Sequence, residues 1–446
     1  MKTKSTQNNI PDGWLHVTLS SIVPSDRKYG IVDGPFGSNL KTIHYQTQGI
    51  PIITSGYVTE GRFLANEYLY VTPEKYEKEK RSAVKGGDIV MAKIGARCGA
   101  SAIMPHDHPN GILSGNALKI TVDERRYVPK LIWHMLWRLY QTGKIAALRT
   151  VGAQPAISIA SLKIFKLTIP PLPEQKRIVG VLEVWDSYLA KLARKIEIKK
   201  QIKKGLMRQL LTGKRRLKGF SEPWKPIPLK KVGHFFKGEG ISKAELVENG
   251  FKAVRYGELY TRHHIKIKQI FSFIAKETTE NAVRLKNGDI AFAGSGETID
   301  EIGKSAVYLD NDDCYVGGDV IVLRVNAQND AMFLAFCLNS LAARKELRKM
   351  GQGQSVVHIY KKDLEKLTLG VPALKEQRAI ADILTKADDE IEAMEKKKKI
   401  IEAQKKYLLN NLITGTIRTP ENLLDRDCRA SSKLAMTGKG KNNGCN

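Results

Sequence analysis

Apolar residues recur at alternating steps of four and three in two stretches of the chain. The first stretch has this spacing at Ile178, Leu182, Trp185, Leu189, Leu192 and Ile196. The second has it at Ile380, Leu384, Ala387, Ile391 and Met394. Alternation of four and three is the a/d pattern of helices that pair as coiled coils. The pattern predicts two long helices with narrow apolar seams, each of which needs a partner seam.

Prolines and glycines mark the ends of these helices. Pro170, Pro171 and Pro173 begin the first and Pro372 the second, whereas Gly213 and Gly415 follow the last apolar residues. A glycine there can take the left-handed conformation that ends a helix. Each helix spans roughly 38 residues, or ~57 Å. Gly205 is expected to lower the stability of the first helix by about 1 kcal/mol relative to alanine, without ending the helix. Beyond Ile196 the seam is predicted to shift phase, to Ile198, Ile202, Leu206 and Leu210.

The segment that begins each long helix, which we call the helix entry, occurs twice in the sequence. PPLPEQKRI at 170–178 recurs as PALKEQRAI at 372–380, so that Glu174 matches Glu376 at an offset of 202. The same offset carries Asp186 onto Asp388 without a gap. Looser matches lie upstream: Gly-Asp-Ile at 87–89 and 288–290, and Trp14 with Trp224. Such a repeat indicates two copies of one unit, each a globular part followed by a helix.

The repeat divides the chain into parts with different expected structure. Short β-branched segments predict strands at 49–54, 88–95, 117–122, 289–294 and 319–325, and apolar stretches predict helices at 130–141 and 331–350. The globular parts are therefore mixed α/β (α+β). The predicted boundaries are a flexible N-terminus (1–11), a first globular part (12–169), a first long helix (170–218), a second globular part (219–370), a second long helix (371–418) and a disordered tail (419–446).

The net charge of the chain indicates a binding protein and not only a helical scaffold. The 446 residues include 73 Lys and Arg against 46 Asp and Glu, a net charge of +27. An excess of this size favours a polyanionic partner, nucleic acid first and an anionic membrane surface second, although charge for solubility alone is the simpler alternative. The first long helix is strongly basic and the second nearly neutral. This difference fits either a solvated face or a basic strip that faces phosphates or an acidic protein.

Glycine-rich loops in both globular parts mix basic and aromatic residues. Small residues let the backbone approach a ligand, and cationic and aromatic side chains contact phosphates and base edges. Ordinary surface loops have the same composition, so the inference depends on the set and on the net charge. The candidate DNA contacts are Lys41, Arg62, Lys93 and Arg97 in the first part, and Lys237, Lys243, Arg255, Tyr256, Arg262 and Lys304 in the second.

Catalytic motifs are missing from the sequence. Gly303-Lys304-Ser305 ends like a phosphate-binding loop, but Thr298 stands where its first glycine belongs. HExxH, GxSxG and CxxC motifs do not occur, and the five cysteines are scattered. The adjacent His263 and His264 would point to opposite faces of a strand, which disfavours a metal site. Without a signal peptide or an apolar run of membrane-spanning length, we expect a cytoplasmic, non-catalytic protein without bound cofactors or metal.

The duplicated helix entry behind two dissimilar α/β parts resembles the specificity subunit of type I restriction–modification systems. The PLPEQ segment, its second copy and the tryptophans Trp14 and Trp224 carry the resemblance, over residues ~12–418. It implies two target-recognition domains that each read half of a split site on double-stranded DNA, joined by an antiparallel coiled coil. It also implies two methyltransferase subunits docked on the helices, and translocase–endonuclease subunits, with S-adenosylmethionine, ATP and Mg²⁺ bound by these partners. Lys375 replaces the proline of the family's entry pattern in the second copy.

Two other hypotheses compete with this one. A basic coiled-coil scaffold would not read DNA sequence at all. A self-contained nuclease or methyltransferase with unfamiliar motifs would be active as the purified chain.

Overall fold

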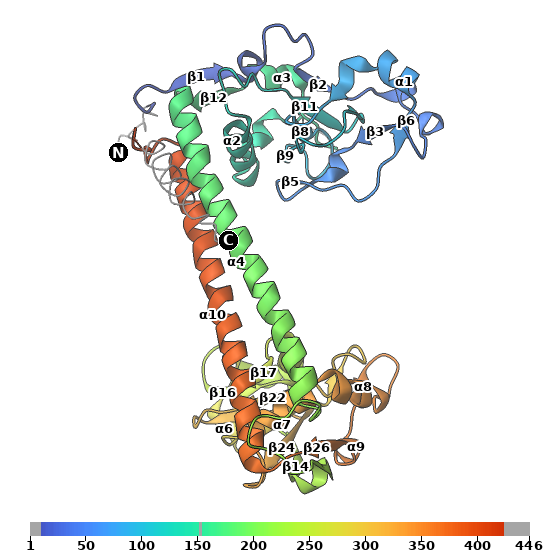
Figure 1. Ribbon diagram of the computed structural model, residues 1–446, viewed down its shortest axis with the longest axis vertical. Helices are drawn as coiled ribbons and strands as arrows, with labels where there is room; N and C mark the ends of the chain where they lie inside the picture. The colour runs from blue at the N-terminus through green and yellow to red at the C-terminus, as the bar shows by residue number, and fades with distance from the viewer. Residues whose placement is uncertain (1–9, 151–153, 423–446) are drawn as a thin grey trace, which may run out of the picture. The chain divides into compact units, whose positions relative to one another are not determined.

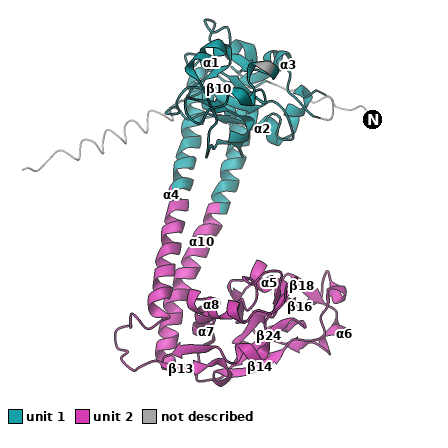
Figure 2. Cartoon of the chain, turned by 90° about the vertical axis from the view of Figure 1, so that its right-hand side faces the viewer, with its two compact units in different colours: residues 1–190, 399–446 teal, residues 191–398 magenta. Residues whose placement is uncertain are grey.

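The computed structural model describes residues 10–150 and 154–422. Most of the predicted flexible N-terminus and of the predicted tail, residues 1–9 and 423–446, lies outside the described residues. The chain divides into two compact units, residues 1–190 with 399–446, and residues 191–398 (Figure 2). The division cuts both long helices, so each unit holds one globular part, part of one helix and part of the other.

The two long helices are α4 (Leu172–Leu210) and α10 (Leu374–Leu412). Each has 39 residues, and both their first and their last residues differ by 202. The gapless repeat therefore corresponds to two helices of equal length. As predicted, α4 continues through Gly205. Gly213 and Gly415 follow the helix ends with φ of +67° and +72°, the left-handed conformation expected of them.

Within each unit, segments of α4 and α10 lie side by side and run antiparallel (Figure 1). In the first unit, Glu174 pairs with Arg418 and Asp186 with Lys405. In the second unit, Lys199 pairs with Glu390 and Lys203 with Asp388. Residue numbers rise along one helix as they fall along the other, which confirms the antiparallel coiled coil.

The predicted phase shift of the seam is wrong. Ile198 and Ile202 are 49% and 51% exposed, whereas Lys203 is buried. The four–three spacing continues unbroken from Ile196 through Lys199 and Lys203 to the apolar residues Leu206 and Leu210. The seam admits these lysines because carboxylates on α10 pair with their ammonium groups. A polar residue at a seam position fixes the register of a coiled coil, and Lys405 takes the equivalent place in α10.

The first globular part holds two four-stranded sheets. Their orders are β2-β11-β8-β9 and β6-β3-β10-β7, and all neighbours are antiparallel except the parallel pair β3–β10. The strands are β1 (Leu15–Thr18), β2 (Ile31–Asp33), β3 (Ile50–Ile53), β4 (Val58–Thr59), β5 (Arg62–Phe63), β6 (Tyr70–Val71), β7 (Ala83–Val84), β8 (Ile89–Ala92), β9 (Ser101–Ile103), β10 (Gly111–Leu113), β11 (Ala117–Ile120) and β12 (Lys166–Ile169). The helices are α1 (Pro73–Lys78), α2 (Pro129–Gln141) and α3 (Ile159–Ile164), with short 3-10 turns at Leu19–Ile22, Gly37–Asn39, Thr42–His44, Ser55–Tyr57, Lys80–Ser82 and Lys144–Leu148.

The second globular part repeats this plan with one more strand in each sheet. The orders are β14-β24-β20-β22-β17 and β15-β18-β16-β23-β19. The strands are β13 (Lys225–Pro228), β14 (Gly233–Lys237), β15 (Leu246–Val247), β16 (Phe251–Val254), β17 (Ile265–Ile267), β18 (Ser272–Ile274), β19 (Val283–Arg284), β20 (Asp289–Ala293), β21 (Ser295–Gly296), β22 (Ser305–Tyr308), β23 (Cys314–Val316), β24 (Val320–Val325), β25 (Val357–His358) and β26 (Thr368–Val371). The helices are α5 (Tyr256–Thr261), α6 (Lys276–Thr279), α7 (Ala331–Leu338), α8 (Leu341–Lys349) and α9 (Lys361–Leu364), with 3-10 turns at Leu229–Lys231 and Lys243–Glu245.

The predicted strands are all present, and the predicted mixed α/β class is confirmed. The single helix expected at 331–350 is instead two, α7 and α8. Asn339 donates from its amide to the Ser305 carbonyl oxygen at 2.8 Å, and the Ser340 hydroxyl accepts from the Ala343 N–H as the cap of α8. Both side chains compete with the helical hydrogen bonds at this point and so break the helix.

The repeated Gly-Asp-Ile segment encloses a buried carboxylate in each globular part. Asp88 accepts from the Thr121 hydroxyl at 2.6 Å and pairs with the buried Lys119. Asp289 is held by two nitrogens of Arg324, at 3.0 and 2.8 Å. A buried carboxylate needs such partners, so the repeat reflects a shared packing solution.

Candidate nucleic-acid interface

The repeated glutamate of the helix entry sits at the centre of a buried polar cluster. In the first unit, Glu174 is 3% exposed and accepts from the Trp14 indole at 3.2 Å. Two nitrogens of Arg418 donate to its two carboxylate oxygens at 2.6 and 2.7 Å. Arg418 also donates to the Asp12 carbonyl oxygen at 2.9 Å. We call Trp14, Glu174 and Arg418 the first joint, because it ties a globular part to the start of one helix and to the segment after the other.

The second unit repeats this cluster with the same geometry. Glu376 is 1% exposed, accepts from the Trp224 indole at 3.3 Å and is held by two nitrogens of Arg216, both at 2.8 Å. This hydrogen bonding raises the pKa of Arg216 above its ordinary value. Trp224, Glu376 and Arg216 form the second joint. Neither arginine was predicted as a functional residue, although the offset of 202 that pairs the glutamates also carries Arg216 onto Arg418.

The glutamine of the entry segment ties each long helix to the helix packed on it. Gln175 accepts from the Val128 N–H, just before α2, at 2.9 Å and donates to the Pro170 carbonyl oxygen at 2.9 Å. Gln377 accepts from the Asp330 N–H, just before α7, at 2.8 Å and donates to the Pro372 carbonyl oxygen at 2.9 Å. The Glu-Gln pair thus connects each long helix to its globular part.

The seam residues predicted before the expected phase shift, from Ile178 to Leu192 and from Ile380 to Met394, are all buried or half-buried. Ile178 and Leu182 belong to the core of the first unit together with Leu412. Ile380 and Leu384 belong to that of the second, where they join Leu210. These four residues therefore anchor helix to globular part as well as helix to helix. Of the rest, Leu192 and Ile391 are buried, whereas those that stay half-buried are Trp185, Leu189 and Met394.

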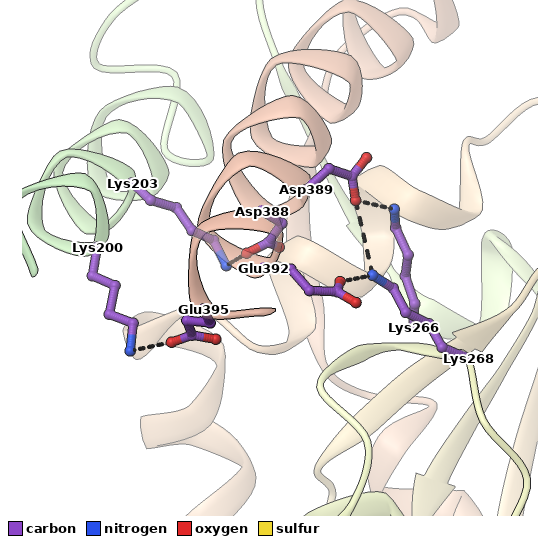
Figure 3. Close-up of polar contacts among 8 residues, drawn as sticks. All are labelled: Lys200, Lys203, Lys266, Lys268, Asp388, Asp389, Glu392 and Glu395. Carbon is purple, nitrogen blue, oxygen red and sulfur yellow. Dashed lines mark hydrogen bonds and ion pairs between the residues drawn. The ribbon is translucent and has the colours of Figure 1, made fainter. Parts of the chain in front are cut away.

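The second globular part has an additional ionic contact with α10. Lys266 of the extra strand β17 pairs with Asp389 at 3.4 Å, and Lys268 pairs with Glu392 and Asp389 (Figure 3). Lys268 and Lys396 lower the pKa of Glu392 to about 2. The offset of 202 places Ser187 and Ala190 at the matching positions of α4, so these positions cannot form the same contact; in the first part Lys130 of α2 pairs instead with Glu183 of α4 at 3.3 Å.

Two of the four candidate DNA contacts in the first part come together at one hairpin. Arg62 opens β5, is exposed and lies 3.6 Å from Glu60 in the turn of the β4–β5 hairpin. Arg97 reaches the same hairpin and donates to the Val58 carbonyl oxygen at 3.0 Å. Arg97 and Glu60 line a hollow of about 450 Å³ together with the stacked rings of Trp137 and Tyr140. These aromatic residues were not predicted, although their spacing along α2 signals a shared face.

The other two candidates in the first part lie apart from the hairpin. Lys93 pairs with Asp33 at 2.5 Å and lies 4.1 Å from the Phe36 ring centre, so its charge is already compensated. Lys41 is exposed at the start of a 3-10 turn. Lys41 remains available to a ligand, whereas Lys93 first has to leave its carboxylate.

Three candidates in the second part cluster around α5. Arg255 caps this helix, bonds the Ser272 hydroxyl at 3.2 Å and lies 3.7 Å from Glu258. Tyr256 is half-buried at its first residue. Arg262 follows its last residue, is exposed and lies 5.1 Å from the Phe271 ring centre.

The remaining candidates in the second part are separate from α5. Lys237 ends β14 and lies 3.8 Å from Asp319, with most of its side chain exposed. Lys243 is exposed in the following 3-10 turn. Lys304 is half-buried just before β22. Burial lowers the pKa of His264, and the charges of Lys203 and Lys304 add to this effect.

The backbone is strained at the same place in both globular parts. Glu60 and Ile265 have φ of +49° and +61°, and they are the non-glycine residues with positive φ in the described ranges. Both lie downstream of an inner strand of one sheet, β3 or β16: Glu60 is in the turn before β5, and Ile265 is the first residue of β17. Such strain is costly for a β-branched residue and persists where function or packing requires it. The segments 55–63 and 255–265, which we call the strained segments, also carry four of the ten candidates.

No group of three or more His, Cys, Asp or Glu side chains in the described part of the chain is arranged to hold a metal ion. His263 is buried, and burial lowers its pKa. Within the same residues, no helix combines the length and the apolar content needed to cross a membrane.

Comparison with known proteins gives a consistent result. A family model described as "Type I restriction modification DNA specificity domain" matches residues 11–204 and 221–403. The chain is 26% identical over 394 residues to the type I restriction enzyme MjaVIII specificity subunit of Methanocaldococcus jannaschii, covering 82% of this chain and 86% of that protein. It is 21% identical over 392 residues to the EcoKI specificity subunit of Escherichia coli K12, covering 83% and 81%. In fold it is similar to the crystal structure of a type I S subunit from M. genitalium, with a TM-score of 0.55 at 17% identity over 92% of this chain and 99% of that one.

Proposed function

This chain belongs to the family of type I restriction modification DNA specificity domains, and from that premise we propose that it is the DNA sequence-specificity subunit of a type I restriction–modification complex. In this proposal each globular part is a recognition domain that reads one half of a bipartite, asymmetric site on double-stranded DNA. The helices set the spacing between the halves and dock two methyltransferase subunits.

The main observation behind the proposal is that the two globular parts are attached to the long helices in the same way but have different surfaces. The first and second joints have the same hydrogen bonds, so both recognition domains are attached alike. The strained segments differ: one forms the β4–β5 hairpin with Arg62, and the other forms α5 followed by Arg262. One frame with two different surfaces is what an asymmetric two-part DNA site requires.

The outer faces of the helices support docking of partner subunits. Ile198 in α4 and Ile400 in α10 are 49% and 59% exposed, and they differ by 202 residues. Exposed apolar residues at equivalent places suit two copies of one partner, each on its own half of the chain. We propose that methyltransferase subunits cover these faces and that translocase–endonuclease subunits join the complex. Catalysis, with S-adenosylmethionine, ATP and Mg²⁺, then belongs to those partners.

Single-molecule methylome sequencing of cells that express the chain with its methyltransferase tests this proposal. We expect a bipartite methylated motif for the wild type. Arg97→Ala is expected to relax one half of the motif and Arg262→Ala the other, because each arginine belongs to a different recognition domain. Losing one good base contact costs about 1–3 kcal/mol of discrimination.

Two results would contradict the proposal. Equal relaxation of both halves by either variant would remove the assignment of one domain to one half-site. Absence of any methylated motif in cells with an active, assembled methyltransferase would favour the scaffold hypothesis. Thermal unfolding of each variant is the control, since Arg97 also holds the β4–β5 hairpin through the Val58 carbonyl.

A further inference from the structure

The turn that ends α4 carries an uncompensated group of positive charges. Arg208, Gln209, Lys214 and Arg215 are exposed and line a hollow of about 380 Å³. None of the three cations has an ion-pair partner within the described residues, although other exposed lysines and arginines of the chain, such as Lys80, Arg125 and Arg284, do. We call Arg208, Lys214 and Arg215 the cationic turn.

The turn that ends α10 has the same backbone. In both turns the glycine N–H donates to the carbonyl of the last helical residue at 3.3 Å, and the residue two after the glycine donates to the carbonyl six residues before it at 3.2 Å. The glycine φ values are +67° and +72°. The side chains differ, since the positions equivalent to the cationic turn are Asn410, Thr416 and Ile417. The fold therefore does not require positive charge here.

The helix dipole explains only part of the cluster. A cation in the last turn of a helix is favoured by the partial negative charge of the helix end, which accounts for Arg208. Lys214 and Arg215 lie beyond the helix end, where this effect falls off. Three like charges around one hollow repel one another, and an anion in the hollow would relieve that repulsion. Two guanidinium groups suit phosphate in particular, because each can donate two parallel hydrogen bonds to its oxygens.

We propose that the cationic turn binds phosphate groups of the DNA backbone, beside the half-site that the second recognition domain reads. The neutral turn after α10 makes no equivalent contact. The complex therefore binds the DNA backbone more strongly at one half of its site than at the other. This inference rests on the proposed function and adds a contact that carries no sequence information. Phosphate contacts are favoured over an acidic protein surface by the two arginines and by the concave shape of the site.

The test uses the chain assembled with its methyltransferase subunits and a duplex that contains the methylated motif. The triple variant Arg208→Asn, Lys214→Thr and Arg215→Ile copies the turn after α10, which the same backbone already accommodates. Binding is measured over a series of salt concentrations. We expect the slope of log Kobs against log[salt] to become shallower by about 2 to 3, since each lost phosphate contact removes about 0.9. The preference for the motif over a scrambled duplex should not change.

A charge-retaining control, Arg208→Lys with Arg215→Lys, is expected to keep most of the wild-type slope. Hydroxyl-radical footprinting should lose backbone protection only beside the half-site of the second domain. An unchanged slope in the triple variant overturns the inference. Loss of assembly with the methyltransferase also overturns it, because the turn would then face an acidic protein surface. If the wild type itself shows no motif preference, the proposed function fails, and the salt slopes still decide the inference separately.

Discussion

His134 lies in α2 at the position that Phe336 occupies in α7, counted by the 202-residue offset. It is 3% exposed, and neither ring nitrogen has a hydrogen-bond partner. Burial, together with the nearby Lys405 and Lys130, lowers its pKa to about 3 against the opposing effect of Asp186. A histidine is thus kept neutral where its counterpart is a plain aromatic residue.

We expect this histidine to make the first unit sensitive to acid. The unfolded chain binds the proton near pH 6.5, whereas the folded chain resists it down to about pH 3. The stabilisation is therefore complete above pH 6.5 and is lost progressively as the pH falls toward 3. At pH 5 the loss is about 2 kcal/mol. In His134→Phe, urea unfolding at pH 8 and pH 5 should differ by about 2 kcal/mol less than in the wild type. An equal pH dependence in both proteins would show that His134 is not the responsible group.

The glutamates of the two joints should matter equally. Each is buried and accepts from one indole and from two nitrogens of one arginine. Glu174→Ala and Glu376→Ala leave these donors without their acceptor, so each should lower the free energy of unfolding of its own unit by about 2–3 kcal/mol. Glu→Gln variants, which keep the shape and one acceptor, should cost less. Chemical unfolding monitored by tryptophan fluorescence measures both, and a large effect at only one joint would contradict their equivalence.

At the scale of elements, α4 and the turn that follows it offer a pair of glycines with opposite expectations. A Cβ at Gly205 would meet no atom within 4 Å, and the residue lies inside a helix. Gly205→Ala should therefore stabilise the second unit by about 1 kcal/mol. Gly213 has φ of +67°, and a Cβ there would lie 3.3 Å from Trp224. Gly213→Ala should destabilise the same unit. Thermal unfolding of the two variants checks the sign of each effect, and a destabilising Gly205→Ala would mean that α4 bends there for a reason.

Local patterns predicted the elements well, because periodicity, proline and glycine act over a few residues. The bounds of α4 and α10, and strands such as β8 and β20, follow from such signals. The predictions that needed long-range information were less complete. From the sequence alone, Lys203 is expected to be exposed to solvent, because its partner Asp388 lies 185 residues later in the other helix. The pattern therefore favoured Ile202 as the seam residue, which is wrong. Lys93 similarly reads as a free cation until Asp33, 60 residues earlier, pairs with it.

At the scale of the whole molecule, the chain consists of two copies of one unit that differ at a few places. The joints, the seam lysines and the glycine turns match at an offset of 202 residues. The differences are concentrated in the strained segments, in the extra strands of the second domain and in the cationic turn. The matching features hold the helices and the globular parts together. The surface of either recognition domain can therefore change to suit a new DNA site while the joints and the helices stay the same.

If the helices set the spacing between half-sites, their length should set the number of unread base pairs. Four residues inserted after Ile196 and another four after Lys398, which are equivalent positions, lengthen each helix by about 6 Å. Successive base pairs are about 3.4 Å apart, so the spacer should grow by one or two base pairs while both half-sites stay the same. Methylome sequencing reads the spacer directly. Seven-residue insertions at the same places should add about three base pairs. Insertion into α4 alone misaligns the Lys203–Asp388 pair and should abolish a defined motif. A spacer unchanged by the paired insertions would mean that something other than the helices sets the distance.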